Sequence, residues 1–208
     1  MATHKKKVVY PIVFMVIVTS IFTLVLAVIN ELTYDTIQEQ SRIKTQSKLL
    51  YALDIEYENN DENIVNTYSE YITEKSTENY TYYMAEKDEE IIGYAFEVVG
   101  KGLWGQIRSY VAFDDSFNQL KGVDFISHSE TPGLGGRIDE RWFVDQFQGI
   151  EVSESEDGEY LVFKPSIGGN IDSITGATST SKAVRTIFNE NIDQILQAKE
   201  EVINESKN

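Results

Sequence analysis

The chain has 208 residues, no cysteine and a formal net charge of −16 at pH 7. This length suffices for one domain with a buried core plus attached segments. The absence of cysteine excludes disulfides, iron–sulfur clusters and zinc–thiolate sites, so any redox chemistry requires an organic cofactor or a metal with oxygen and nitrogen ligands. The acidic surface argues against nucleic-acid partners, because phosphate backbones are also anionic.

The first predicted element is a membrane-spanning helix over residues 8–29. The stretch from Val8 to Ile29 contains no charged residue, and at about 1.5 Å per residue it spans a hydrocarbon core of roughly 30 Å. Lys5, Lys6 and Lys7 precede it. Because positive charge is retained on the cytoplasmic side, we expect a cytoplasmic tail (1–7), a single pass through the cell (inner) membrane and an extracytoplasmic main domain.

A cleaved signal peptide is the competing interpretation of this segment. Signal peptides usually carry a shorter apolar run of about 7–15 residues that ends in a small-residue cleavage site. The sequence that follows the apolar core, Leu26-Ala-Val-Ile-Asn-Glu31, matches such a site poorly. The pattern therefore favours an uncleaved anchor.

Residues 30–79 are predicted to form a stalk with two helices that lead into the main domain. Polar residues dominate this stretch, and thin apolar stripes indicate helices at 35–54 and 61–74. Asp61 is the expected N-cap of the second helix, because an aspartate side chain accepts hydrogen bonds from the first free N–H groups.

Residues 80–208 are predicted to form an α+β domain in which an antiparallel sheet packs with helices. The apolar pattern first alternates with a period of two, as expected for strands with one buried face. The alternating residues are Ile92, Tyr94, Phe96 and Val98, then Ile107, Ser109, Val111 and Phe113, then Val123 and Phe125. A short helix is expected at 140–147 and a strand at 160–163. After Thr178 the period becomes helical, which predicts a long helix on the sheet.

Three glycine-rich turns stand out in this domain: residues 100–105 (GKGLWG), 130–136 (ETPGLGG) and 172–181 (DSITGATSTS). Glycine permits positive φ and lets the backbone approach a ligand closely. Pro132-Gly133 also suits the central positions of a type II turn. One such turn is weak evidence for a site, whereas three in one domain favour a ligand.

Thr178 stands where the third turn meets the last predicted helix. Its hydroxyl and the free N–H groups of a helix start suit a phosphate, and the helix dipole favours negative charge there. Lys182 lies four residues on, on the same helix face, beside such a phosphate. Gly176 and Ala177 keep bulk away from the approach. The alternative is structural, because threonine is a common N-cap.

The three motifs together resemble the FMN-binding domain family. The stretch Asp172-x-x-Thr-Gly-Ala-Thr178 is similar to the family's flavinylation motif. Glu130-Thr-Pro-Gly-Leu-Gly135 and Gly100-Lys-Gly-Leu-Trp104 resemble two further hallmarks, and the anchor matches too, so the resemblance covers residues 8–198. The family includes the G subunit of the Rnf ion-translocating electron-transport complex and the C subunit of sodium-pumping NADH:quinone reductase.

The resemblance implies FMN joined to Thr178 by a phosphoester, which a separate flavin transferase forms from FAD. Thr175 stands where many relatives have serine, so the hydroxyl is kept. Asp172 resembles the acid that the transferase needs, although an Asx turn is the structural alternative. The cofactor-binding residues expected from the three turns are Trp104, Glu130, Thr131, Gly133, Leu134, Gly135, Thr175, Gly176, Ala177, Ser179 and Lys182.

Individual roles within this set are expected as follows. Thr131 and Leu134 line the flavin ring, and Glu130 braces its loop or accepts a hydrogen bond. Trp104 either stacks near the flavin or packs beside the sheet. His128 has no histidine or cysteine near it in sequence, so no metal site is expected.

The implied function is that of a membrane-anchored flavoprotein that relays electrons among the other membrane subunits of an Rnf-type complex. The sequence of residues 142–149 (WFVDQFQG) favours the G subunit, whereas GKGLWG keeps the C subunit of the quinone reductase open. The chain carries no dinucleotide fingerprint, so it is not expected to be a complete enzyme. The alternative from another class is a non-redox extracytoplasmic binding or sensor module.

Overall fold

The structure is a computed structural model that describes residues 2–77, 80–154 and 158–206. The chain divides into two units, residues 1–43 and 44–208. The first unit is helical and belongs to α1 (Ala2–Ala52). From Val9 onward, α1 contains a window of mean hydropathy 3.0, long and apolar enough to cross a membrane by length and composition. The predicted apolar helix is therefore present, and the helix expected at 35–54 is its unbroken continuation.

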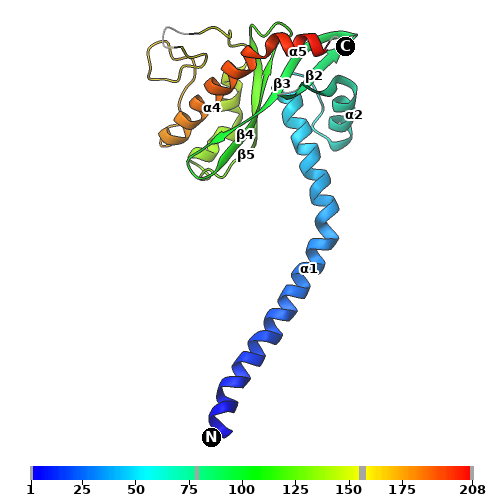
Figure 1. Ribbon diagram of the computed structural model, residues 1–208, viewed down its shortest axis with the longest axis vertical. Helices are drawn as coiled ribbons and strands as arrows, with labels where there is room; N and C mark the ends of the chain where they lie inside the picture. The colour runs from blue at the N-terminus through cyan, green and yellow to red at the C-terminus, as the bar shows by residue number, and fades with distance from the viewer. Residues whose placement is uncertain (1, 78–79, 155–157, 207–208) are drawn as a thin grey trace. The chain divides into compact units, whose positions relative to one another are not determined.

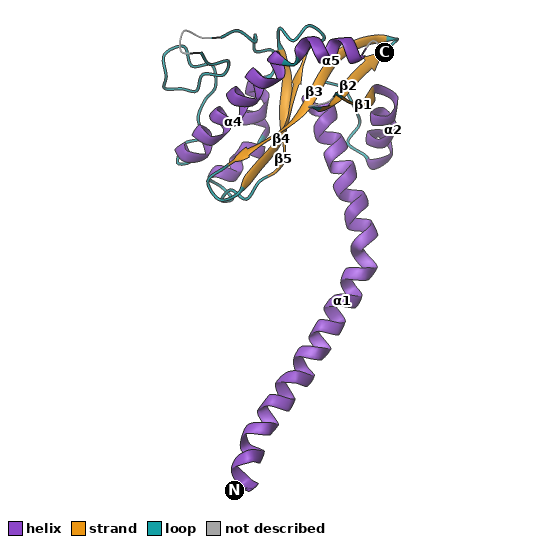
Figure 2. Ribbon diagram, viewed as in Figure 1, coloured by secondary structure: helices purple, strands orange, loops and turns teal. Residues whose placement is uncertain are grey.

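The second unit is built on a five-stranded antiparallel sheet with the strand order β1-β2-β3-β4-β5, shown in orange in Figure 2. This arrangement confirms the predicted α+β architecture. The strands are β1 (Ile72–Ser76), β2 (Thr81–Lys87), β3 (Glu90–Lys101), β4 (Gln106–Phe113) and β5 (Leu120–Ser127). β1 was not predicted, since the pattern indicated a helix at residues 72–74. That helix, α2 (Asp61–Tyr71), instead ends where the β-branched pair Ile72-Thr73 begins the strand.

One face of the sheet packs against α4 (Thr178–Gln197), which lies along it in Figure 1, and α5 (Lys199–Ser206) follows. The buried face of α4 repeats every three or four residues, as predicted, through Val184, Ile187, Phe188, Ile192 and Ile195. Gly100 on β3 permits the close approach of this helix, because a Cβ atom at that position would clash with the side chain of Ile187.

The other face of the sheet is also covered, although the alternating pattern predicted a single buried face. Within the second unit, the last turns of α1 pack there. A Cβ atom at Gly122 would lie 3.1 Å from the carbonyl oxygen of Ala52. Asp124, only 1% exposed, accepts hydrogen bonds of 3.0 Å from Lys48 Nζ and Arg141 Nη1. The buried acid is thus paired with two cations, and the one from Lys48 ties α1 to β5.

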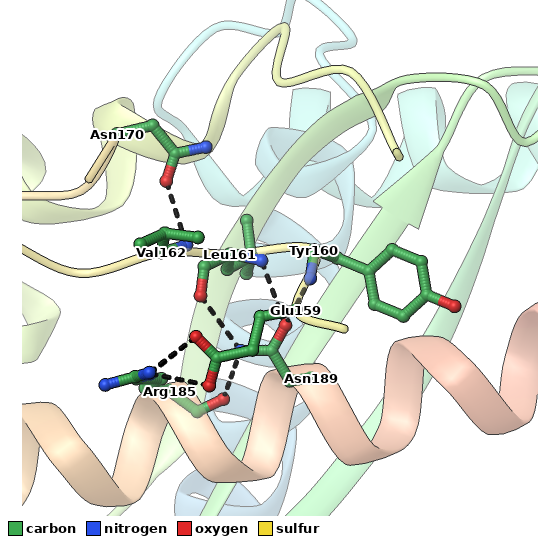
Figure 3. Close-up of polar contacts among 7 residues, drawn as sticks. All are labelled: Glu159, Tyr160, Leu161, Val162, Asn170, Arg185 and Asn189. Atoms are coloured by element: carbon green, nitrogen blue, oxygen red, sulfur yellow. Dashed lines mark hydrogen bonds and ion pairs between the residues drawn. The ribbon is translucent and has the colours of Figure 1, made fainter. Parts of the chain in front are cut away.

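Two further local predictions were wrong. The N-cap of α2 is Asn60, whose side chain accepts a hydrogen bond of 2.8 Å from the backbone N–H of Asn63, and Asp61 is the first helical residue. Residues 160–163 do not form a strand. They lie in an irregular segment bonded to α4 through Asn189 (Figure 3), with one isolated parallel bridge between Phe163 and Ile171.

The short helix expected at 140–147 is present. It consists of α3 (Arg141–Val144) and the 3-10 turn η2 (Asp145–Phe147), preceded by the 3-10 turn η1 (Gly135–Asp139). Phe143, Val144 and Phe147 are fully buried in the main core. This segment therefore connects β5 to the core beside the second glycine-rich turn.

Candidate functional site

The structure brings the three glycine-rich turns together. The first joins β3 to β4, the second follows β5, and the third leads into α4. They enclose a cleft of about 280 Å³, whose lining residues are Leu103, Glu130, Thr131, Leu134, Gly135, Gly176, Ala177, Thr178, Ser179 and Thr180. All except Leu103 and Thr180 were predicted site residues. Leu103 precedes the predicted residue Trp104, but nothing in the sequence indicated that its side chain faces the cleft.

Glu130 connects the three turns to one another. It is 5% exposed, and its Oε1 accepts hydrogen bonds from the backbone N–H groups of Leu103 (2.8 Å) and Trp104 (3.2 Å). Its Oε2 accepts a 2.6 Å hydrogen bond from the hydroxyl of Thr180 on α4. Such charge-assisted bonds compensate the cost of burying a carboxylate. Gly135 leaves the room that this clamp needs, because a Cβ atom there would clash with Thr180 Oγ1.

The second turn has the geometry that Pro132-Gly133 predicts. Gly133 has φ of +72°, and the N–H of Leu134 donates to the carbonyl oxygen of Thr131 over 3.1 Å, as in a type II turn. The Leu134 side chain is 47% exposed and borders the cleft. This turn therefore presents an apolar surface beside the cleft.

His128 positions Glu130 from the preceding residues. Its Nδ1 accepts a hydrogen bond of 3.2 Å from the backbone N–H of Glu130, and its Nε2 lies 3.1 Å from Asp139 Oδ2. Among the described residues, no group of three histidine, aspartate or glutamate side chains is arranged to hold a metal ion. The sequence gave no signal for this contact.

Thr178 is the first residue of α4 and does not cap it. The N-cap is Ala177, which has no side-chain capping bond, so the structural alternative for Thr178 is wrong. The hydroxyl of Ser181, rather than that of Thr178, accepts a hydrogen bond from a backbone N–H of the preceding turn, that of Ile174 at 3.0 Å. Thr178 is exposed, and its hydroxyl forms no hydrogen bond with any residue in the described ranges. The hydroxyl is therefore free to react or to bind.

Backbone donors accompany this hydroxyl. Ser181 is the first residue of α4 whose N–H bonds to a carbonyl oxygen, that of Ala177. The N–H groups of residues 178–180 have no acceptor in the described part of the chain, as expected for the first turn of a helix. These donors and the helix dipole favour an anion next to Thr178.

Two further hollows flank the third turn. One of about 190 Å³ lies between α4 and residues 163–166 and is lined by Thr178, Lys182, Arg185 and Lys164, among others. The second, about 530 Å³, is lined by Asp172, Thr175 and Trp142, among others. The predicted site residues Lys182, Asp172 and Thr175 therefore lie beside the cleft rather than in it.

Two predicted residues line none of the three hollows. Trp104 is 69% exposed and does not pack against the sheet, which contradicts its structural alternative. Gly133 has no atom within 4 Å of a built Cβ position. Both residues lie on turns next to the cleft without lining it, and Trp104 contacts the lining through its backbone N–H, which donates to Glu130.

Electrostatic contacts fix the walls of the larger hollow. Asp172 forms an exposed ion pair of 2.8 Å with Lys164 Nζ, and its N–H donates to Gln146 Oε1 over 2.7 Å. The indole N–H of Trp142 donates to Glu140, and this bond, with a smaller contribution from Arg137, lowers the pKa of the Glu140 carboxyl. These contacts position the wall residues.

Comparison with known proteins places the chain in a family. Residues 102–193, which contain most of the first turn and all of the other two, match the model of the FMN-binding domain. The chain is 31% identical over 186 residues to a protein of Shewanella piezotolerans, covering 83% of this chain and 85% of that relative. It is 33% identical to a protein of Yersinia pestis, with 76% of each chain covered. Both relatives are named as the G subunit of an ion-translocating oxidoreductase complex.

Solved structures share the fold. The chain aligns with the C subunit of the Na⁺-translocating NADH-quinone reductase of Parabacteroides distasonis at a TM-score of 0.62 and 23% identity, over 73% of this chain and 89% of that one. NqrC of Shewanella oneidensis aligns at a TM-score of 0.60 and 21% identity, over 71% and 90%. These likenesses establish the fold, and the sequence relatives establish the family. The chain belongs to the FMN-binding domain family, together with proteins named as G subunits of ion-translocating oxidoreductase complexes.

Proposed function

We propose that this protein is a membrane-anchored electron-transport flavoprotein, the G subunit of an Rnf-type ion-translocating oxidoreductase complex. Family membership supports a flavin site, and the names of the two sequence relatives favour the G subunit of that complex over the C subunit of the quinone reductase. When bound, FMN supplies the electron-accepting and electron-donating chemistry that this cysteine-free chain lacks.

The residues around Thr178 fit FMN. The cleft offers an apolar wall at Leu134 and Leu103, and it offers hydroxyls and free N–H groups at the start of α4. An apolar wall with a few convergent polar groups is typical of a cofactor site. In this proposal, the turn that contains Thr131 and Leu134 faces the flavin ring, and Glu130 holds this turn in place.

The single observation that carries the covalent assignment is the free hydroxyl of Thr178 in a pocket lined by the family's motif. We propose that a flavin transferase uses FAD as donor. The Thr178 oxygen bonds to the FMN phosphorus, the diphosphate bond breaks, AMP leaves, and the hydroxyl proton passes to a base of the transferase. Asp172, which precedes Thr178 in the motif and lines the larger hollow with an exposed side chain, is assigned to recognition by that enzyme.

The domain organisation follows from the same assignment. Residues 1–7 form a cytoplasmic tail, and residues 8–29 cross the inner membrane. Residues 30–79 connect this membrane helix to residues 80–208, which carry FMN outside the cytoplasm. The apolar, exposed side chains of α1 support the crossing, and the lysines before it support the orientation. The partners are then the other membrane subunits of the complex.

The test is in-gel flavin fluorescence of the denatured full chain after co-expression with a flavin transferase. The wild type is expected to fluoresce, Thr178→Ala to be dark, and Thr175→Ala to retain a reduced signal. Thr178→Ser is the matched control, because it keeps the hydroxyl. Fluorescence of Thr178→Ala equal to that of the wild type would refute the assignment, and a dark wild type beside an active transferase would favour a non-redox module.

A further inference from the structure

The small hollow on the far side of Thr178 differs in charge from the cleft. Lys164, Lys182 and Arg185 all line it, and no acidic residue within the described ranges does. The only charged residue in the described lining of the cleft is Glu130, an acid. Thr178 lines both spaces. A group attached to its hydroxyl therefore stands at a boundary between a cationic space and one without cations.

One wall of this hollow is a strap, residues 159–171, that is fastened to α4. Figure 3 shows Asn189 of α4 bonded to the strap backbone. Its Oδ1 accepts hydrogen bonds from the N–H groups of Tyr160 (2.7 Å) and Leu161 (2.9 Å), and its Nδ2 donates to the carbonyl oxygen of Leu161 (2.9 Å). These contacts hold the strap, and with it Lys164, beside the start of α4.

The three cations differ in how far their charge is compensated. Arg185 Nε and Nη2 both donate to Glu159 at distances of 2.5–3.0 Å (Figure 3). Lys164 is paired with Asp172. Lys182 forms no ion pair with any residue in the described part of the chain. The charge of Lys182, one helical turn beyond Thr178, is therefore uncompensated and available to an anion.

We propose that this hollow is a phosphate subsite, in which Lys182 is the principal cation and Lys164 and Arg185 complete the wall. This inference rests on the proposed function and deepens it. The phosphate of FMN lies in the hollow, while the uncharged flavin ring lies in the cleft across Thr178. The subsite makes the protein select phosphorylated flavins, FMN and the FMN half of FAD, over riboflavin, which has the same ring and no phosphate.

The test measures the affinities of FMN and riboflavin for the full chain in detergent micelles, by quenching of flavin fluorescence. Thr178→Ala serves as the background so that no covalent bond forms. FMN is expected to bind at least about threefold more tightly than riboflavin, the range of a partly exposed charge pair. Lys182→Gln in this background is expected to remove most of that preference and leave riboflavin binding unchanged. Lys87→Gln, which removes an exposed cation on β2, is the control for net charge.

Equal affinity for the two flavins, no binding of FMN, or an unchanged preference in Lys182→Gln would each overturn the subsite. The covalent proposal is judged separately, on the chain with Thr178 intact. A phosphate preference without covalent loading would refute only the linkage. Covalent loading without a preference would refute only the subsite.

Discussion

At the scale of single residues, Glu130 organises the site because each of its two carboxylate oxygens holds a different neighbour. Glu130→Ala would leave two backbone N–H groups and the Thr180 hydroxyl without their acceptor. We expect a loss of about 3 kcal/mol in the free energy of unfolding, measured by denaturant titration. Glu130→Gln keeps an acceptor of the same shape, so its loss should be smaller. Equal losses in the two variants would contradict the clamp.

Thr178 and Ser181 provide a matched pair of hydroxyl deletions on the same helix. Thr178→Ala removes an exposed hydroxyl with no partner in the described ranges, so stability should change by no more than about 0.5 kcal/mol. Ser181→Ala removes the acceptor of Ile174 N–H and should cost about 1–2 kcal/mol. Thermal unfolding of both variants checks this order. A larger loss in Thr178→Ala would show that Thr178 is a structural residue.

At the scale of elements, Asn189 fastens an irregular strap to a regular helix. Asn189→Ala should free the N–H groups of Tyr160 and Leu161 and raise amide hydrogen exchange across the strap, with a loss of about 1–3 kcal/mol in global stability. Asn191→Ala is the control, since the side chain of Asn191 donates within α4, to the carbonyl oxygen of Ile187, and to no strap residue in the described ranges. Unchanged exchange in the strap of Asn189→Ala would contradict its role as the fastening residue.

The end of α1 joins the sheet through ionisable groups, and this junction predicts a pH dependence. Burial first, and then the hydrogen bond to Asp145, raises the pKa of Tyr51 from 10.0 to about 12. Between these two values the unfolded chain loses the tyrosine proton while the folded chain keeps it, so stability should fall as pH rises through this window. The Tyr51→Phe variant has no phenol hydroxyl at this position to lose a proton in this pH window.

Denaturant titrations of the wild type and of Tyr51→Phe check this prediction. They are made at several pH values, from below the tyrosine pKa of the unfolded chain up to the Tyr51 pKa of the folded chain. The variant should be less stable at the lowest of these pH values, because it loses the bond to Asp145, yet its stability should fall less steeply as the pH rises. Other buried tyrosines with a raised pKa, such as Tyr110, contribute equally to both slopes. Identical slopes in the two proteins would contradict the assignment.

The sequence predicted those elements whose residue pattern has a direct physical cause. Alternation in residues 92–98 and 107–113 predicted β3 and β4, and the helical period after Thr178 predicted α4. β1 was missed because its five residues alternate too briefly to outweigh a helix pattern. The second buried face of the sheet was missed because Asp124, a polar residue in the pattern, is buried only through its pairing with Lys48 and Arg141.

The site was predictable in its location and less so in its contacts. Glycine spacing and the motif residues identified the three turns that meet at the cleft. The hydrogen bond from Thr180 to Glu130 joins residues fifty positions apart, and no local pattern encodes such a contact. Of the cationic hollow the sequence predicted only Lys182, because Lys164 reaches the hollow through the strap that Asn189 holds, and the sequence had indicated a strand at residues 160–163.

At the scale of the whole molecule, the charge distribution predicts its orientation in the membrane. The chain has no cysteine, so single cysteines placed by Thr3→Cys and Glu190→Cys are unambiguous probes. A membrane-impermeant maleimide added to intact spheroplasts should label Glu190→Cys and leave Thr3→Cys unlabelled until the membrane is opened. Labelling in the opposite order would place the flavin domain in the cytoplasm and refute the proposed topology.

Covalent attachment of FMN to Thr178 is central to the proposed function, and the mass of the protein tests it most directly. Intact-mass measurement of the full chain co-expressed with a flavin transferase, followed by mapping of the peptide that contains residues 172–181, locates any added group. We predict an increase of one FMN less one water on that peptide, absent in Thr178→Ala. An unmodified wild type, beside a transferase that labels another acceptor, would contradict the attachment.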